Sequence, residues 1–321
     1  MPTPTTTYMS GRTPVQVESA PAIAGPTDDL PPTVAAPAAK VDEYLRAYID
    51  STELPANLKS AILYSLLGPG KRARPLLAWH SFVAVDASGA DPARVLPAAG
   101  AAELIHSFSL VHDDLPGLDN DDLRRGRPTL HKHTSEAMAV LAGDSMLTLA
   151  FQLLTERIDD RTIAARLCGE LALGTNGMIA GQVYDTLGGF EPNLTDAQKL
   201  RTIHSHKTGM LIRASCRMGA ICAGADAAAL AAITRYAEDI GLMFQIVDDL
   251  LDVTQSTAHL GKRAGKDQEA GKLTYPGIMG IEPSRQEVER LHTESLQMLE
   301  MFGARAEPLR HLATSMARRT R

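Results

Sequence analysis

The chain of 321 residues has little of several residue types, and each shortage argues against a class of protein. Cys168, Cys216 and Cys222 form no closely spaced pair, so neither a disulfide scaffold nor a cysteine zinc site is expected. Sparse free thiols fit a reducing compartment, and we expect a cytoplasmic protein. A net charge of −6 disfavours a nucleic-acid-binding protein with a broad basic face. No uncharged apolar run approaches the roughly 18 to 20 residues of a membrane span, so we expect no such span.

The first 39 residues differ from the rest of the chain. They hold eight of the 19 prolines and few large apolar side chains. Such a segment cannot bury enough apolar surface to order itself, and it lacks the pattern of a secretory or transit peptide. We expect residues 1–39 to be a disordered tail and residues 40–321 to form one domain.

From residue 40 onward the apolar residues recur at helical spacing, as Ile233, Tyr236, Ala237, Ile240 and Met243 do. Alternating β-branched runs of the kind that form strands are absent from the sequence. We predict an all-α, single-domain bundle of about ten or more helices around a central cavity. Apolar stretches separated by short Gly, Pro or Asp-rich breaks lie at 58–67, 75–87, 96–112, 136–155, 162–185, 200–224, 227–252 and 285–301.

Two aspartate clusters end apolar helical stretches. Residues 113–122 read Asp-Asp-Leu-Pro-Gly-Leu-Asp-Asn-Asp-Asp, and residues 248–252 read Asp-Asp-Leu-Leu-Asp. Carboxylates this crowded repel one another unless cations neutralise them. Ligand sets made only of oxygen favour hard ions such as Mg²⁺, whose shell substrate phosphates can complete. Solvated acidic segments are the alternative, but two clusters on apolar helices favour a magnesium site with a diphosphate substrate.

Helical spacing places the members of the second cluster together. Gln245, Asp248, Asp249 and Asp252 stand at i, i+3, i+4 and i+7, so they share one face of a helix. The same seven-residue separation joins His106 to Asp113 of the first cluster.

Basic residues next to glycine or to the acidic cluster could complement these carboxylates. Lys71, Arg72 and Arg74 follow Gly70, and Arg124 and Arg125 come directly after the first acidic cluster. A guanidinium group can bind phosphate through two hydrogen bonds, whereas lysine acts as a point charge. A solvated basic face is the alternative for each stretch alone, and the combination favours diphosphate binding.

Two histidine pairs have the wrong spacing for a metal site. His131 and His133, and likewise His204 and His206, are two residues apart, so on a helix their rings point apart. We expect surface pairs at both places.

Together these motifs resemble the trans-isoprenyl diphosphate synthases, and bacterial farnesyl diphosphate synthases in particular. The resemblance covers about residues 40–321 and implies the isoprenoid synthase type of helical fold. One departure is Pro69, where the family usually has a glycine. The motifs follow in family order at 70–75, 105–126, 181–185, 206–209, 244–252 and 261–263 with 271–272.

The resemblance implies a role for each matching residue. Magnesium, in three ions, would be held by Asp113, Asp114, Asp119, Asp248, Asp249 and Asp252. The allylic diphosphate would be held by Arg124, Lys207 and Lys262, and isopentenyl diphosphate by Lys71, Arg74, His106 and Arg125. Thr208 and Gln245 would lie near the allylic carbon, so with Lys207 they are the expected catalytic residues.

The resemblance also implies a reaction and an assembly. Isopentenyl diphosphate would condense with dimethylallyl and geranyl diphosphate, and the homodimer is the expected state. Phe108 matches the family's aromatic floor position beside the smaller Ser109, and with the Pro-Gly insertion in the first motif it favours a farnesyl product. Geranyl or geranylgeranyl diphosphate synthases stay open as alternatives, followed by a class I terpene cyclase and a non-catalytic subunit.

Overall fold

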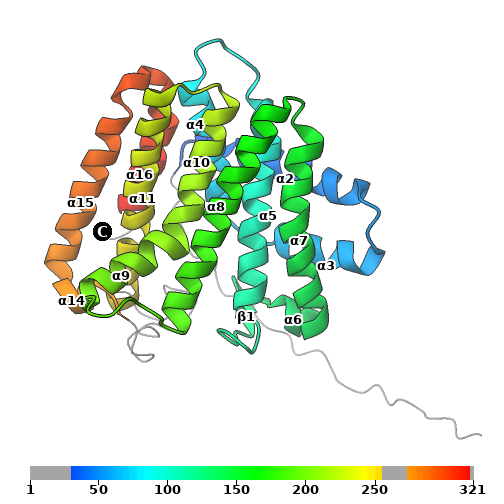
Figure 1. Ribbon diagram of the computed structural model, residues 1–321, viewed down its shortest axis with the longest axis horizontal. Coiled ribbons are helices and arrows are strands. Elements are labelled where there is room, and N and C mark those ends of the chain that lie inside the picture. Colours follow the sequence, from blue (N-terminus) through cyan, green and yellow to red (C-terminus); the bar gives the residue numbers. More distant parts are fainter. Residues whose placement is uncertain (1–29, 255–272, 319–321) are drawn as a thin grey trace, which may run out of the picture.

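The computed structural model describes residues 30–254 and 273–318, and Figure 1 shows them as a bundle of long helices. The expected all-α fold is confirmed. In the described part, the strands are two-residue segments, β1 (Leu123–Arg124) and β2 (Arg127–Pro128), paired antiparallel. The α-helices are α1 (Pro32–Ala35), α2 (Pro37–Ser51), α3 (Ala56–Leu66), α4 (Ala73–Val85), α5 (Leu96–Asp113), α6 (Leu130–His133), α7 (Glu136–Arg157), α8 (Arg161–Thr186), α9 (Asp196–His204), α10 (Met210–Cys222), α11 (Ala227–Thr254), α14 (Tyr275–Met279), α15 (Ile281–Met298) and α16 (Glu307–Arg318).

Short helical turns of other types link some of these helices. They are η1 (Pro92–Val95), η2 (Ser205–Gly209) and η3 (Glu300–Ala306). The turn η2 is a π-helical segment between α9 and α10.

Side-chain caps set where several helices begin. Ser135 accepts a hydrogen bond from the backbone N–H of Met138 at the start of α7, and Asp160 caps α8 in the same way. Thr195 and Gln198 form a reciprocal capping box at the start of α9. These caps satisfy backbone donors that have no partner inside the helix.

The core is built in two layers that share α4 and α10. One apolar cluster lies among α2, α3, α5, α7 and α8, and the other lies among α11, α15 and α16. Helix α4 gives Trp79 and Phe82 to the first cluster and Leu76 and Leu77 to the second. Figure 1 shows α10 between α8 and α11, both of which it contacts. The two central helices therefore fix α5 and α11, which carry the aspartate clusters, relative to each other.

The helical part begins before residue 40, where the sequence had placed the start of the domain. Residues 30–39, which we expected in the tail, form α1 and the start of α2. Leu30 and Val34 are buried in the second cluster, and Nε2 of His80 lies 2.8 Å from the carbonyl oxygen of Val34. The cause of this earlier start is the burial of Val34 in α1 and of Leu30 just before it, together with the contact between Val34 and His80 on α4. Residues 1–29 lie outside the described residues.

In the part of the chain searched, α7 is the one helix long and apolar enough to cross a membrane. It has 22 residues and a mean hydropathy of 1.6, with 44% of the apolar window buried. Core helices of soluble proteins share these properties, and α7 packs along α5. The expected lack of a membrane span therefore stays a prediction.

The three cysteines are free thiols, as predicted. Burial raises the pKa of Cys216 and of Cys222 to about 12, so both thiols stay protonated at neutral pH. They fill the interior as small apolar groups.

Candidate active site

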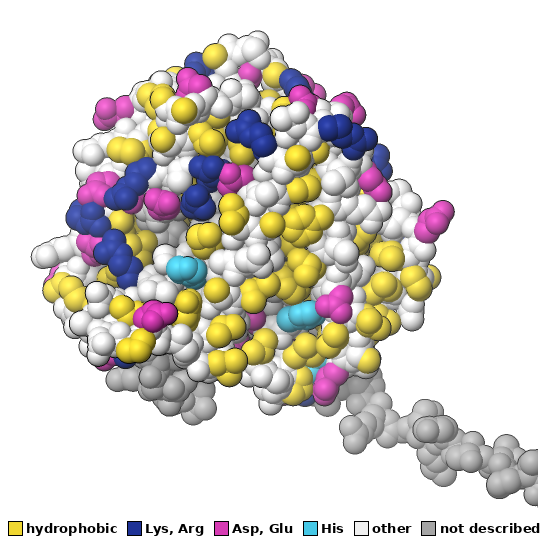
Figure 2. Space-filling model, viewed as in Figure 1, with side chains coloured by type: hydrophobic (Ala, Val, Ile, Leu, Met, Phe, Trp, Pro, Cys, Tyr) yellow, Lys and Arg dark blue, Asp and Glu magenta, His cyan; other side chains and the backbone are white. Residues whose placement is uncertain are grey.

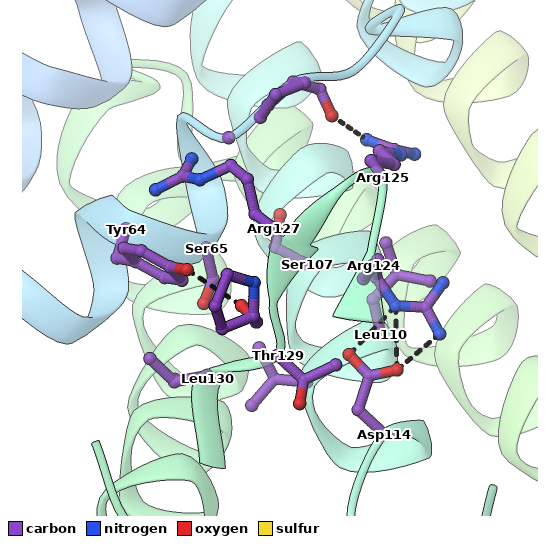
Figure 3. Close-up of a pocket in the computed structure, with 14 residues that line it drawn as sticks. Tyr64, Ser65, Ser107, Leu110, Asp114, Arg124, Arg125, Arg127, Thr129 and Leu130 are labelled. Atoms are coloured by element: carbon purple, nitrogen blue, oxygen red, sulfur yellow. Dashed lines mark hydrogen bonds and ion pairs between the residues drawn. The ribbon is translucent and has the colours of Figure 1, made fainter. Parts of the chain in front are cut away.

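The first acidic cluster stands at the end of α5, as predicted. Asp113 is the last residue of the helix and Asp114 is its C-cap. The chain then turns back as the β1–β2 hairpin, and Arg124 donates hydrogen bonds of 2.6 to 2.9 Å to both carboxylate oxygens of Asp114 (Figure 3). Burial raises the pKa of Asp114, and the Arg124 guanidinium opposes that shift. The predicted metal ligand and the predicted diphosphate ligand are therefore paired with each other.

Asp113 lies next to groups from two other parts of the chain. Burial raises its pKa to about 6, Lys207 lowers it, and Asp119 raises it further. Asp119 lies in the exposed turn after α5, where its backbone N–H donates to the carbonyl oxygen of Asp113 at 2.8 Å. The end of α5 thus brings together Asp113, Asp119 and Lys207, although Lys207 is distant in the sequence.

Lys207 is presented by the π-helical turn η2. Its Nζ donates a 2.6 Å hydrogen bond to Oδ2 of Asp185, near the end of α8. A methyl group at Gly181 would lie 2.1 Å from the backbone nitrogen of Lys207, so glycine is needed where α8 meets η2. Sequence analysis noted the motif at 181–185 but missed this ion pair. The four-residue spacing of Gly181 and Asp185 was the available signal.

Thr208 and Gln245, the residues predicted near the allylic carbon, are in direct contact. The Thr208 hydroxyl donates to Oε1 of Gln245 at 2.8 Å and connects η2 with α11. Thr208 is buried and Gln245 is half-buried, so water has limited access to this bond.

The second acidic cluster lies in the last turns of α11. Asp249 and Asp252 are buried, and Asp248 is half-buried. Oδ2 of Asp249 accepts a hydrogen bond of 2.9 Å from the backbone N–H of Tyr275 at the start of α14. Oδ1 of Asp252 is buried without a hydrogen-bond partner within the described ranges.

The expected surface location is wrong for one histidine of each pair. His204 is buried, its ring stacks on Tyr275, and its Nε2 lies 3.6 Å from Oδ2 of Asp249. Burial lowers the pKa of His204 to about 4, so the ring is neutral at physiological pH. His131 is also buried, and its Nδ1 lies 3.1 Å from the hydroxyl of Thr129. The ring of His204 meets residues of α11 and α14, and that of His131 meets the N-cap residue of its own helix, which the two-residue spacing does not reveal.

A second group of cations lies around His106, nearer the N-terminus of α5 than the acidic cluster. Burial and the charge of nearby Arg125 lower the pKa of Arg74 to about 10, so Arg74 stays charged at neutral pH. Burial and the arginines at 74, 125, 124 and 72 lower the pKa of His106 well below its ordinary value, so this ring is neutral. Three of the four residues expected to bind isopentenyl diphosphate thus lie together. The fourth, Lys71, stands in the loop directly before α4 and is half-buried.

Glu103 is a buried member of this group that sequence analysis did not assign. It lies 3.4 Å from Nη1 of Arg72, and Arg72 also donates to Asp42 and to the carbonyl oxygen of Gly68. Burial raises the pKa of Glu103, while Arg72, Arg74 and Arg125 lower it. Arg72 therefore holds the loop before α4 in place and leaves Arg74 for a ligand. In the part that the structure describes, Nε of Arg74 is buried with no hydrogen-bond partner.

The donor atoms suit magnesium, although the described residues hold no ready site. Among residues 30–254 and 273–318, no three His, Cys, Asp or Glu side chains form a group that could hold one metal ion. The carboxylates instead face cations and backbone N–H groups, as Asp114 faces Arg124. Oδ1 of Asp252, which has no partner within these ranges, is a donor atom that a bound cation could satisfy. An oxygen-only set of this kind fits Mg²⁺.

The two residues predicted to set chain length lie one turn below the first acidic cluster. Phe108 is buried in the first core cluster and meets the ring of His112 edge-on, with centroids 5.1 Å apart. The Ser109 hydroxyl donates to the carbonyl oxygen of His106 at 2.9 Å. Their effect on the product stays a prediction. Lys262 lies outside the described residues.

Comparison with known proteins agrees with this geometry. The family model of polyprenyl synthetases matches residues 55–302. The chain is 45% identical to geranylgeranyl pyrophosphate synthase 7 of Arabidopsis thaliana over 87% of this chain and 81% of the relative. It is also 45% identical to farnesyl diphosphate synthase of Geobacillus stearothermophilus, over 80% and 86%. The crystal structure of geranyltransferase from Legionella pneumophila superimposes with a TM-score of 0.77 and 30% identity, covering 90% of this chain and 96% of that one. The helical architecture, the paired aspartate clusters and these matches agree, and the chain belongs to the polyprenyl synthetase family.

Proposed function

We propose that this protein condenses isopentenyl diphosphate with dimethylallyl and then geranyl diphosphate, and that farnesyl diphosphate is its main product. Membership of the polyprenyl synthetase family supports trans-prenyltransferase activity. The relatives include both farnesyl and geranylgeranyl diphosphate synthases, so the product length is the finer part of the proposal.

The observation that carries the proposal is the presence of two separate cationic groups along α5. Arg124 and Lys207 lie at the acidic end of the helix, and Arg74 and Arg125 surround His106. A condensation of two diphosphates needs two anion sites, and each group could hold one. Arg74 has a buried donor without a partner in the described part, so an incoming anion oxygen would satisfy it.

The residues at the end of α5 would support ionisation of the allylic substrate. The allylic C1–O bond breaks and the diphosphate leaves with the electron pair. The double bond of isopentenyl diphosphate then forms the new carbon–carbon bond, and a proton is lost to restore an alkene. Lys207 and Arg124 would stabilise the leaving charge after exchanging Asp185 and Asp114 for phosphate oxygens. The released diphosphate is the expected proton acceptor.

Thr208 and Gln245 would act on the carbon that becomes positive. Their joined oxygen dipoles could stabilise that charge in a site from which water is excluded. Neutral His106 would hydrogen-bond the second diphosphate without adding charge.

Magnesium is the expected cofactor, in three ions. Asp113, Asp114 and Asp119 on one side, and Asp248, Asp249 and Asp252 on the other, would hold it. When bound, Mg²⁺ neutralises the charge of the departing diphosphate.

A homodimer is also proposed. Helices α7 and α8 expose large apolar side chains, including Leu141 at 57%, Leu173 at 58% and Leu187 at 77%. Figure 2 shows apolar side chains gathered over the middle of the face on which these helices lie. A second copy of the chain would cover them. Light scattering of the purified protein checks this, and a monomer at micromolar concentration contradicts it.

Product analysis tests the reaction. Purified protein is incubated with isopentenyl diphosphate, dimethylallyl diphosphate and Mg²⁺, and the dephosphorylated products are identified by mass spectrometry. A fifteen-carbon alcohol is expected. A twenty-carbon product alone would replace the farnesyl assignment with a geranylgeranyl one, and no product would support a non-catalytic subunit. Incubation with farnesyl diphosphate alone separates a terpene cyclase, which would release a volatile hydrocarbon.

Substitution of the acidic clusters tests the metal assignment. Asp113→Ala and Asp248→Ala should each lower turnover by about a thousandfold, because each removes a carboxylate from a shared ion site. Asp159→Ala, in the exposed loop after α7, is the control and should keep normal turnover. Normal turnover in either cluster variant refutes the assignment.

The cytoplasmic location is a further proposal, supported by the three free thiols. Fractionation of cells that express the tagged protein checks it, and recovery from an exported fraction contradicts it.

A further inference from the structure

Tyr64, in the last turn of α3, has partners on both faces of its ring. The ring of His133 on α6 stacks on it, with centroids 3.9 Å apart and planes 7° apart. The guanidinium carbon of Arg127 on β2 lies 4.1 Å from the same centroid. Two groups this close over one ring cannot share a face, so Tyr64 lies between them. Its hydroxyl also donates to the carbonyl oxygen of Pro128 at 2.8 Å.

The hairpin that Tyr64 contacts carries two of the predicted diphosphate ligands. Arg124 on β1 pairs directly with Arg127 on β2, and Arg125 forms the turn with a φ of +52°. A hairpin with two-residue strands is not stable by itself. Its position therefore depends on contacts with the rest of the protein, and the contacts of Arg127 and Pro128 with Tyr64 are prominent among them.

The same hairpin is fastened to the loop before α4. Nη1 of Arg125 donates to the carbonyl oxygen of Pro69 at 2.6 Å. A methyl group at Gly70 would lie 2.2 Å from that nitrogen, so Arg125 rests against the bare backbone of Gly70. This loop begins three residues after Tyr64 and leads to Lys71 and Arg74. Tyr64 thus lies just before the loop that leads to Lys71 and Arg74, and it also contacts the hairpin that carries the other two cations.

Helix α6 and its N-cap residue contact the acidic segment that precedes the hairpin. Lys132 forms a 2.9 Å ion pair with Asp122 in the acidic segment, and the Thr129 hydroxyl donates to the carbonyl oxygen of Asp121 at 2.8 Å. With the stacking of His133 on Tyr64, these bonds tie α6 to α3 and to the acidic segment.

Residues of the hairpin and of α3 line a small pocket of about 60 Å³. Figure 3 shows Tyr64 and Arg127 on one side of this pocket and Arg124 and Arg125 on the other. Pockets that hold organic ligands are usually several times larger, roughly 300 Å³ or more. The space is therefore too small to be a separate site for an organic ligand.

We propose that Tyr64, with Arg127 and His133, is a positioning residue that sets where Arg124 and Arg125 present their guanidinium groups to the two diphosphates. The identity of these anions rests on the proposed function. The positioning role itself rests on the contacts of Tyr64 with the hairpin.

Four variants test the role. Tyr64→Leu removes the ring and hydroxyl, Tyr64→Phe keeps the ring, and Arg127→Met removes the cation while keeping most of the length. Arg157→Met is the matched control, because Arg157 makes the same kind of contact with Tyr48, at 5.7 Å, away from the site. Hydrogen exchange of the amides at 123–127 and the steady-state constants for isopentenyl diphosphate are measured for each.

Tyr64→Leu and Arg127→Met should speed exchange at 123–127 and raise the KM for isopentenyl diphosphate by about tenfold, with kcat changed by less than about threefold. Tyr64→Phe should restore a KM near that of the wild type, and Arg157→Met should match the wild type. Unchanged exchange and KM in a folded Arg127→Met protein overturn the proposal, as does an equal loss in Arg157→Met.

Failure of the proposed function gives a different result. A wild-type protein that does not consume isopentenyl diphosphate refutes that function. Hydrogen exchange and calorimetric titration with inorganic pyrophosphate need no turnover. Faster exchange and weaker pyrophosphate binding in Tyr64→Leu would then still support the positioning role, and wild-type values for both would overturn it.

Discussion

The hydroxyl of Thr208 donates a 2.8 Å hydrogen bond to Oε1 of Gln245, and this bond joins the π-helical turn to the helix that carries the second acidic cluster. The two side chains can therefore act as one unit on the substrate.

This bond predicts coupled effects on turnover. Thr208→Val and Gln245→Leu should each lower kcat by about tenfold, and the double variant should be little worse than either, because each single change already breaks the bond. Steady-state kinetics of the three variants measure the coupling. Thr155→Val is the control, since the Thr155 hydroxyl bonds only carbonyls of its own helix. Multiplying losses in the double variant would show that the two residues act independently.

The close approach of α8 to η2 predicts a strong effect of one methyl group. Gly181→Ala should lower turnover by at least about tenfold, because the methyl group would push Lys207 away from its position. Gly169→Ala on the same helix is the matched control, since a methyl group there meets nothing within 4 Å. Turnover and thermal midpoints are measured for both. Equal turnover in the two variants would mean that the contact does not position Lys207.

Phe108 predicts the length of the product. Phe108→Ala should shift products beyond fifteen carbons, because removing a buried ring leaves volume that a longer chain can fill. Mass spectrometry of the product alcohols measures the shift. Phe302→Ala, which opens space in the other core cluster, should leave the distribution unchanged. An unaltered distribution in Phe108→Ala removes this residue from the account of chain length.

Asp239 on α11 predicts a pH-dependent stability. Burial raises its pKa to about 6, and Glu294 and Glu238 add to the shift, while Arg235 and Arg290 oppose it. The carboxyl group of Asp239 therefore keeps its proton to a higher pH in the folded state than in the unfolded state. Its contribution lowers the free energy of unfolding progressively as the pH rises from about 4 to above 6.

Asp239→Asn should remove that dependence. We compare the free energy of unfolding of the variant with that of the wild type at each pH. The difference in favour of the variant should be larger at pH 8 than at pH 5 by on the order of 1 kcal/mol. Urea unfolding at the two pH values measures the difference, with Asp159→Asn in an exposed loop as the control. A gain that is the same at both pH values would show that Asp239 does not titrate in this range.

Sequence patterns predicted the long helices well because these helices bury apolar stretches. The stretches at 96–112 and 227–252 correspond closely to α5 and α11. Helices α2 and α16 were missed, although each buries a stripe of apolar side chains, such as Val41, Leu45 and Tyr48 in α2. Their many charged residues hide a narrow stripe from a search for apolar stretches.

The site was predicted in its residues but not in its pairings. The aspartate clusters, Thr208 and Gln245 follow from motifs, and helical spacing explains which residues share a face. The ion pairs Lys207–Asp185 and Arg124–Asp114 depend on how helices and a hairpin meet in space. The same holds for the contacts of Tyr64 with Arg127 and His133. A local pattern hints at one of them, since Gly181 and Asp185 are four residues apart, but it does not identify Lys207 as the partner.

The π-helical turn at Ser205–Gly209 has a consequence for changes in chain length. It joins α9 and α10 without a break, so the number of residues in it sets the rotation of one helix relative to the other. A deletion there would turn α9 about its axis while α10 stays packed on α4. We therefore expect this turn to accept changes of side chain but no change in its number of residues.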